Sequence, residues 1–413
     1  MAPESRIPCK TPGCAATVQH ATAIRTGGYC GPCHGRILQS EHEAFIRANR
    51  REIDPFNGVT DPVEIAKLMF RSRKYDPLVV ERNHPVEPGR FLREMRDDDI
   101  QRLIAWSITH SEGETETDKL AVILALKTEH RLDQLHFARL ETGDFYPAVV
   151  FRSASPQIRD ALMLRVEENP NHVLEALAWI GDDRVVRQFG LWRDCPPKFE
   201  HALHIQAHEY SRCGGWELDD AGNRRDLHFD RSIALTTGAL PSSTTAIIDE
   251  STKCPWCGNN LSTLLNIDLT DSRFSWIPFD ESNLSFVTCL NCACFDTVFV
   301  DLKSKMQFIG AMPSSINSIP DERNLPQRSL HPAAGFRAAH EVAEWMYCDG
   351  ECSQIGGHPS WVQDIAYPTC PGCKKTMVFV GQVDLSVFPM QEGVYYAYLC
   401  FPCHISATNY QQT

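Results

Sequence analysis

The first clear pattern of apolar positions begins near Asp61 and has the spacing of a helix. In DPVEIAKLMF, Asp61 is a good capping residue and Pro62 suits the first helical turn. Ile65, Leu68 and Met69 then fall on one face of a helix. The same spacing predicts further helices over Asp99–Ile108, Thr117–Leu126, Leu132–Leu140, Pro156–Glu168, His172–Ile180 and Arg184–Trp192.

Short polar breaks such as ENPN and GDD separate these helices. Breaks of this length favour antiparallel helical hairpins. The rhythm resembles that of a HEAT-like stack, but the segments have no clean repeat period. An irregular helical bundle therefore stays an open alternative.

After Pro196 and Pro197 the pattern changes to one typical of strands. SFVTCL, TVFVDL, TMVFVGQVDL and VYYAYLC are rich in β-branched and aromatic residues. The proline-rich stretch AMPSSINSIPDERNLPQRSLHPAAGF reads as a connector between strands. We predict an α+β, multidomain protein: a four-cysteine zinc module over residues 1–50, a helical domain over 58–196, and a β-rich domain over 197–413.

The amino-acid composition is that of a globular protein. The 413 residues are 43% hydrophobic and 23% charged, as in an ordinary globular protein. No signal peptide and no apolar run of membrane-spanning length is present, so we expect a cytoplasmic protein without a membrane partner. The net charge of −13 disfavours sequence-independent nucleic-acid binding by the whole chain.

The 17 cysteines change this picture, because most of them occur in close pairs. In a reducing compartment such pairs indicate metal sites. Zinc takes four thiolates in a tetrahedron, commonly two from each of two tight turns. We therefore predict three structural zinc ions, held by Cys9, Cys14, Cys30 and Cys33; by Cys254, Cys257, Cys289 and Cys292; and by Cys370, Cys373, Cys400 and Cys403.

Other cysteines leave alternatives open. Cys294 could replace Cys292 as a ligand, and Cys348 with Cys352 and His358 could form half of another site. Cys195 and Cys213 stand apart from the pairs, and we expect them in the core.

Two of the predicted zinc sites belong to segments that resemble each other. CPWCGNNLSTLLNIDL and CPGCKKTMVFVGQVDL align without a gap, and each is followed by a second cysteine pair. Apolar residues match at Leu261/Met377, Leu264/Val380 and Ile267/Val383. The alignment predicts a duplicated unit.

No constellation of residues indicates a catalytic site. The chain has no Walker A, G-x-G-x-x-G or G-x-S-x-G motif. His201, His204 and His208 would share one face of a helix, and we interpret them as a partly buried polar face rather than a metal site. Zinc held by four thiolates has no open position for water, which favours a structural role.

The stretch QIGGHPSWVQDIAYPTCPGC, with MVFVGQVD and SATNYQQT after it, resembles the bacterial YwqG-like domain family. The resemblance is specific over about 354–413 and looser from about 254. It implies a sheet-rich carboxy-terminal domain and an association with toxin–immunity loci. The zinc-knuckle cysteines are an addition to the family pattern. The matching residues are Gly356, Gly357, Pro359, Trp361, Gln363, Gln382 and Asp384.

The same stretch has a physical interpretation. Gly356 and Gly357 permit unusual backbone angles, Trp361 is a large apolar anchor, and Gln363 and Gln382 could bridge backbone groups. These features favour a structural turn over an active site.

We therefore predict a non-enzymatic, zinc-stabilised protein that binds a protein partner, as an immunity protein that neutralises a bacterial toxin. One alternative is a nucleic-acid-binding regulator that uses the amino-terminal module, with its Arg25, Arg36 and Arg47. The other is an enzyme of unknown reaction that uses Trp361, Gln363 and Asp384, or the histidines.

Overall fold

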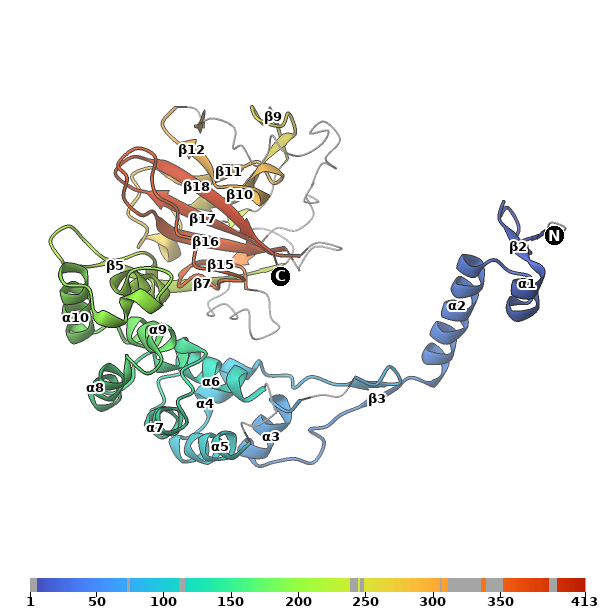
Figure 1. Cartoon of the computed structure of the whole chain (residues 1–413), viewed down its shortest axis with the longest axis horizontal. Helices are drawn as coiled ribbons and strands as arrows, with labels where there is room; N and C mark the ends of the chain where they lie inside the picture. The colour runs from blue at the N-terminus through green and yellow to red at the C-terminus, as the bar shows by residue number, and fades with distance from the viewer. Residues whose placement is uncertain are drawn as a thin grey trace. The chain divides into compact units, whose positions relative to one another are not determined.

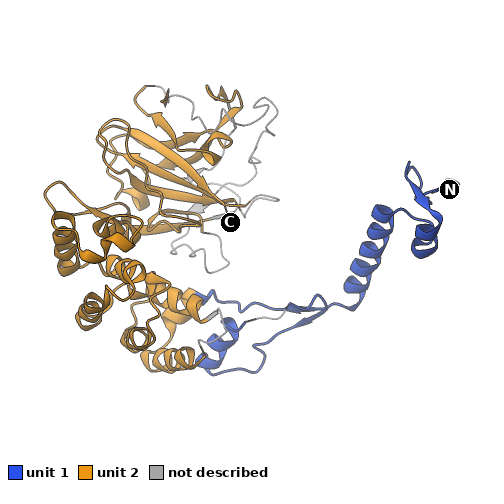
Figure 2. Ribbon diagram, in the orientation of Figure 1, with its two compact units in different colours: residues 1–88 blue, residues 89–413 orange. Residues whose placement is uncertain are grey.

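The computed structural model describes residues 6–72, 75–110, 116–237, 244–245, 249–304, 307–310, 336–338, 352–385 and 392–412. The chain divides into two compact units, residues 1–88 and 89–413 (Figure 2). The boundary expected at residue 197 falls inside the second unit, and the three-domain division stays a prediction. The proline-rich connector over 311–335 and Cys348 lie outside the described residues.

The first unit contains short strands and helices. Strands β1 and β2 pair antiparallel, whereas β3 and β4 pair in parallel. Helix α2 is 19 residues long, and among its residues only Cys33 is buried. The elements are β1 (Arg6–Pro8), β2 (Thr17–Gln19), α1 (His20–Thr26), α2 (Gly31–Asn49), β3 (Arg51–Ile53), α3 (Pro62–Met69) and β4 (Val79–Glu81).

Helix α3 begins where the sequence predicts. The Asp61 carboxylate accepts a hydrogen bond from the backbone N–H of Val63, which caps the helix. The buried face differs from the expected one. Val63 and Ala66 are buried, whereas Ile65 is only partly buried. The apolar residues surround much of this short helix, so their spacing alone does not fix which side packs inward.

Helices make up the first part of the second unit, and all those predicted between residues 99 and 192 are present. Their core includes Leu177, Phe189 and Trp216, each fully buried. The segments are α4 (Pro88–Glu94), α5 (Asp97–Thr109), α6 (Glu116–Lys127), α7 (Asp133–Thr142), η1 (Ala148–Phe151), α8 (Pro156–Arg165), α9 (Pro170–Ile180), α10 (Asp183–Asp194), η2 (Lys198–Ala202) and η3 (Ala207–Gly214).

Strands form the rest of the second unit. An eight-stranded antiparallel sheet has the order β13-β12-β18-β17-β16-β15-β7-β14, and its central strands lie side by side in Figure 1. A four-stranded sheet is built around β10, which pairs with β11, β8 and β9. The strands are β5 (Trp216–Leu218), β6 (Arg224–Asp226), β7 (Phe229–Thr237), β8 (Thr244–Thr245), β9 (Asp249–Lys253), β10 (Asn260–Asp268), β11 (Asn283–Thr288), β12 (Val298–Asp301), β13 (Gln307–Ile309), β14 (Phe336–Ala338), β15 (Gln354–Gly357), β16 (Val378–Asp384), β17 (Val394–Cys400) and β18 (Ile405–Gln411).

The two sheets share a core, and the large sheet is buried on both faces. Along β17, Tyr395 and Leu399 join a cluster that also contains Leu264 of the smaller sheet. Tyr396 and Tyr398 join a second cluster on the opposite face. This alternation follows from the two-residue period of a strand, and it explains why VYYAYLC is apolar throughout.

The fold is therefore α+β. The HEAT-like description of the helices stays a prediction. None of the described helices is long and apolar enough to cross a membrane.

Candidate metal centres and an aromatic cavity

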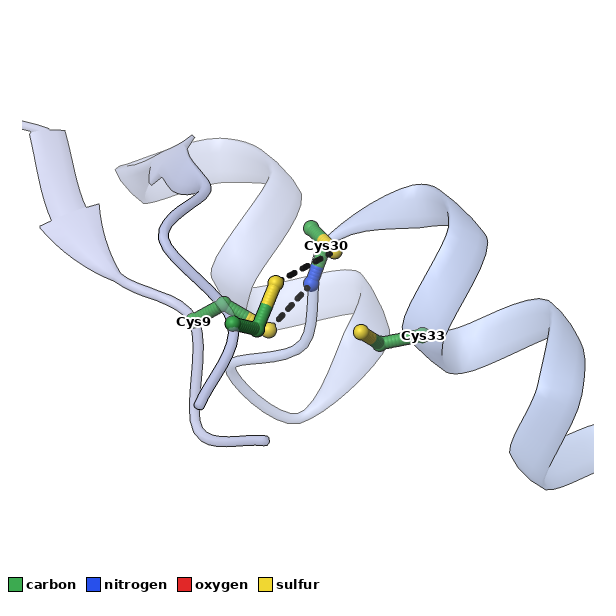
Figure 3. A group of neighbouring side chains, drawn as sticks. Cys9, Cys30 and Cys33 are labelled. Atoms are coloured by element: carbon green, nitrogen blue, oxygen red, sulfur yellow. Dashed lines mark hydrogen bonds between the residues drawn. The ribbon is translucent and has the colours of Figure 1, made fainter. Parts of the chain in front are cut away.

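The amino-terminal cysteines come together in the first unit. Cys9 follows β1, Cys14 lies in the next turn, and Cys30 and Cys33 lie at the start of α2. Cys30 immediately precedes α2, and its backbone N–H donates to the Cys9 sulfur at 3.2 Å (Figure 3). The four sulfur atoms lie within 4.8 Å of one another.

Two further sets of four cysteines lie in the second unit. In each, one pair precedes a strand and the other pair begins at or just after the end of the next, antiparallel strand. Cys254 and Cys257 precede β10, and the matching pair follows β11. The other set frames β16 and β17 in the same way. The sets are Cys254, Cys257, Cys289 and Cys292, and Cys370, Cys373, Cys400 and Cys403.

The distances between sulfur atoms suit a tetrahedral ion. A zinc–sulfur distance of about 2.3 Å places two ligands of a tetrahedron about 3.8 Å apart. The Sγ atoms of Cys14 and Cys30 are 3.8 Å apart, and those of Cys373 and Cys400 are 3.5 Å apart. A disulfide needs about 2.05 Å, so these are separate thiols.

Hydrogen-bond donors lie beside some of the sulfurs. The N–H of Cys30 lowers the pKa of the Cys9 thiol to about 6. The N–H of Lys375 lowers the pKa of the Cys373 thiol to about 7. The Arg36 guanidinium donates to the Cys33 sulfur at 3.1 Å. These donors stabilise the charged form that binds metal.

The two carboxy-terminal sets also match in backbone detail. Gly258 follows the first knuckle with a left-handed φ of 74°, and Lys374 occupies the aligned position with a φ of 63°. The β10–β11 register shifts between Thr263 and Leu265, and the β16–β17 register shifts between Phe379 and Gly381. These irregularities fall at aligned positions, which supports a duplicated unit, because bulges persist within families.

Several other cysteines lie outside these sets. Cys294 donates its thiol hydrogen to the Leu290 carbonyl, so Cys292 and not Cys294 completes its set. The Cys352 thiol contacts the Asp384 carboxylate at 3.5 Å. Cys195 is exposed, contrary to expectation, because it caps the carboxy-terminal end of α10, just after Asp194.

A cavity of about 640 Å³ lies in the second unit, between α9, η1, η3 and the chain after β15. The buried and partly buried side chains that line it, called here its deeper wall, include Glu175, Trp179, Tyr210, Cys213, His358 and Trp361. Exposed or partly exposed side chains around its mouth are Tyr146, His204, Ile205, Gln363, Asp364 and Ile365.

Aromatic rings form part of the cavity walls. The rings of Trp179 and His358 have centroids 4.3 Å apart, and those of Trp361 and Tyr396 have centroids 4.9 Å apart. The indole nitrogen of Trp361 is buried and has no hydrogen-bond partner among the described residues. Trp361 is therefore held by ring packing rather than by its polar atom.

Glu175 is the acidic group in the deeper wall. Burial raises the pKa of this carboxyl, and His172, at 3.5 Å, partly opposes the shift. His358 is partly buried, and desolvation holds the pKa of its imidazole well below the usual range. At neutral pH the wall therefore carries no positive charge from His358.

One curated protein aligns with this chain over its whole length. It is the uncharacterized protein YpfL of Salmonella typhimurium, 35% identical over 430 residues, which cover 99% of this chain and 100% of YpfL. This chain belongs to the YpfL family. No protein-family model matches the chain, and no solved structure matches it. The resemblance to the YwqG-like family stays a prediction.

The glycine-rich turn of this YpfL-family chain has the backbone expected of it. Gly356 and Gly357 have φ values of 71° and 68°. A Cβ on Gly356 would lie 2.1 Å from the Arg231 carbonyl oxygen, so only glycine fits there. The Gln382 side chain accepts from Ser360 N–H and donates to the Cys352 carbonyl, which ties the turn to β16. These contacts support the interpretation as a structural turn.

The histidines of the YpfL-family chain do not share one helical face. The segment between η2 and η3 is irregular, so His201 and His208 lie in separate short helices. The backbone is extended at Leu203 and Gln206, between the two short helices, and one continuous helix does not form. His204 alone of the three lines the cavity. The sequence singled out Trp361 and Gln363 but missed Glu175 and Trp179.

Proposed function

We propose that this YpfL-family chain is a non-enzymatic protein that binds a protein partner and whose fold is stabilised by three structural zinc ions. The observation that carries the proposal is that each cysteine set can fill all four coordination positions of a tetrahedral zinc ion. Each set offers four sulfur ligands. Zinc bound by all four has no open position at which water or substrate could be activated.

The exposed surface of α2 supports a protein partner. Within the first unit this helix is anchored at its start by Cys30 and Cys33, and the rest of it is largely exposed. Leu38 and Phe45 lie two turns apart on it and are 51% and 56% exposed. Helices in proteins gain most of their stability by packing an apolar face, so these side chains suit a partner.

Within this class we favour an immunity protein that neutralises a toxin. The YwqG-like resemblance suggests such loci, and the net charge of −13 suits a basic target that is attracted by the field of the protein. Steering of this kind weakens as salt screens the charges.

The test is co-purification with tagged, full-length protein from its own cells. We expect one stoichiometric, basic protein partner whose capture falls with salt, and whose toxicity in a second host is relieved by co-expression. The Leu38→Ser and Phe45→Ser variants should lose the partner. Leu164→Ser is the matched control, since Leu164 is an 86% exposed leucine on α8.

Two results would contradict the proposal. A partner that stays toxic when co-expressed would exclude the immunity role. Capture of nucleic acid that is sensitive to nuclease, and lost when Arg36 and Arg47 are changed to Ala, would favour the nucleic-acid-binding alternative.

A further inference from the structure

The cavity in the second unit has the size and lining of a small-molecule site. Binding pockets commonly measure about 300–1,000 Å³ and combine apolar walls with a few polar groups. The volume of about 640 Å³ falls in this range, and the cavity is lined mainly by aromatic and aliphatic side chains. Its deeper wall is formed by separate chain segments, which include α9, η3 and the turn after β15.

Aromatic side chains that line this cavity suit a positively charged guest. Trp179 and Trp361 line the deeper wall together with Tyr210, and Tyr146 lies at the mouth. The face of an aromatic ring carries a negative potential that attracts cations, most strongly for Trp. Cages of such rings are the usual means of recognising methylated ammonium groups.

The charges that line the cavity point to the same class of ligand. Glu175 and Asp364 are acidic, and no Lys or Arg is among the described lining residues. His358 stays neutral at pH 7, because burial lowers the pKa of its ring. An anion would therefore meet repulsion here, whereas a cation would gain a counter-ion.

Glu175 has a partly buried carboxylate, with 30% of its side chain exposed. Its contact with His172 is 3.5 Å long, which is beyond a strong hydrogen bond. A carboxylate that is partly removed from water without a close partner costs stability. A cation in the cavity would offset this cost, because its charge would lie opposite the carboxylate.

We propose that this cavity binds a small organic cation with a methylated ammonium group, with Trp179 and Trp361 as its aromatic walls and Glu175 as its counter-ion. The methylated class is favoured over a primary amine because the walls offer rings rather than a set of hydrogen-bond acceptors. The inference goes beyond the proposed partner binding and does not rest on it.

Titration of the full-length, zinc-loaded protein tests the proposal. The probes are tetramethylammonium, choline and benzyltrimethylammonium, followed by tryptophan fluorescence and calorimetry. The neutral control is 3,3-dimethylbutan-1-ol, which has the shape of choline without its charge. We expect saturable binding of at least one cation, with the neutral alcohol about tenfold or more weaker.

Variants distinguish the contribution of the counter-ion to binding from that of the aromatic walls. Glu175→Gln keeps the shape of the side chain and should weaken cation binding about tenfold while leaving the alcohol unchanged. Trp179→Leu should weaken the binding of the cations. Glu167→Gln removes an exposed charge on the turn after α8, outside the cavity, and should change nothing.

The outcomes are distinct from those of the partner experiment. Equal binding of choline and the neutral alcohol, or equal losses in Glu175→Gln and Glu167→Gln, would overturn the cation site. So would the absence of saturable binding for all three cations up to about 10 mM, a limit that corresponds to less than about 2.7 kcal/mol of binding.

Discussion

The turns that follow Cys257 and Cys373 place two different residue types in the same left-handed backbone conformation. Gly258 and Lys374 occupy aligned positions and have φ values of 74° and 63°. A residue with a Cβ pays about 1–2 kcal/mol for this conformation, whereas glycine adopts it freely. The second knuckle therefore carries backbone strain that the first does not.

Lys374→Gly should stabilise the zinc-loaded protein by up to about 1 kcal/mol, because it removes that strain. Gly258→Ala should destabilise it by about 1 kcal/mol, and its Cβ would meet no neighbouring atom within 4 Å. Urea denaturation of both variants at pH 7.5 measures the two effects. Effects of the same sign in both would contradict the argument from φ.

Glu175 gives a prediction of the pH dependence of stability. Burial raises the pKa of this carboxyl in the folded state above its unfolded value. The folded state then binds more protons than the unfolded state as pH rises through these values, so stability falls with rising pH. The loss is complete once the pH exceeds the folded pKa.

Glu175→Gln has no charge to bury and should therefore be more stable than the natural protein at pH 7.5. The difference should shrink towards pH 5, as the carboxyl of the natural protein takes up its proton. Parallel urea midpoints at both pH values check this, and zinc loss affects both proteins alike. A variant less stable at pH 7.5 would mean that the His172 contact outweighs the burial.

At the scale of elements, each carboxy-terminal cysteine set frames a pair of antiparallel strands. The strands β10 and β11 lie between the two knuckles of one set, and β16 and β17 between those of the other. Zinc binding to structural sites contributes apparent free energies of about 10–16 kcal/mol. We therefore expect the folding of each strand pair to depend on its metal.

Cys370→Ser should lower the zinc content from three ions to two per chain and reduce stability by several kcal/mol. Cys294→Ser is the matched control, because Cys294 lies outside the sets and serine can keep its hydrogen bond to the Leu290 carbonyl. Elemental analysis of the purified variants measures the zinc. Three ions in Cys370→Ser, or two in Cys294→Ser, would contradict the assignment of ligands.

Local patterns explain which elements the sequence reveals. The C-x-x-C pairs and VYYAYLC carry their signal within a few residues, and β17 runs from Val394 to Cys400 as predicted. Helix α2 was missed because it begins Gly31–Pro32, contains Gly35 and packs only Cys33 inward. A helix without a buried face has little of the periodicity by which helices are recognised.

At the scale of the whole molecule, the chain forms two compact units, and each should hold its own metal. The set that contains Cys9 lies within residues 1–88, and the other two lie within 89–413. A fragment of residues 89–413 should therefore fold, bind two zinc ions and keep the cavity. Circular dichroism and elemental analysis check this, and an aggregated or metal-free fragment would contradict it.

The cavity could not be predicted from the sequence, because its walls come from segments far apart in the chain. Trp179 lies on α9, whereas Trp361 follows β15, and neither has a local motif. The sequence indicates that Trp361 is an anchor, but its neighbours are chosen by tertiary packing. Glu175 resembles any exposed acid on a helix until the fold surrounds it.

The aligned bulges have a consequence for the origin of this chain. Leu264 and Val380 lie at the matching irregularities, and both belong to the core that the two sheets share. The two repeats thus cover each other's apolar faces, as two subunits of a dimer would. A duplication of one cysteine-framed hairpin would account for both the matched register shifts and the shared core.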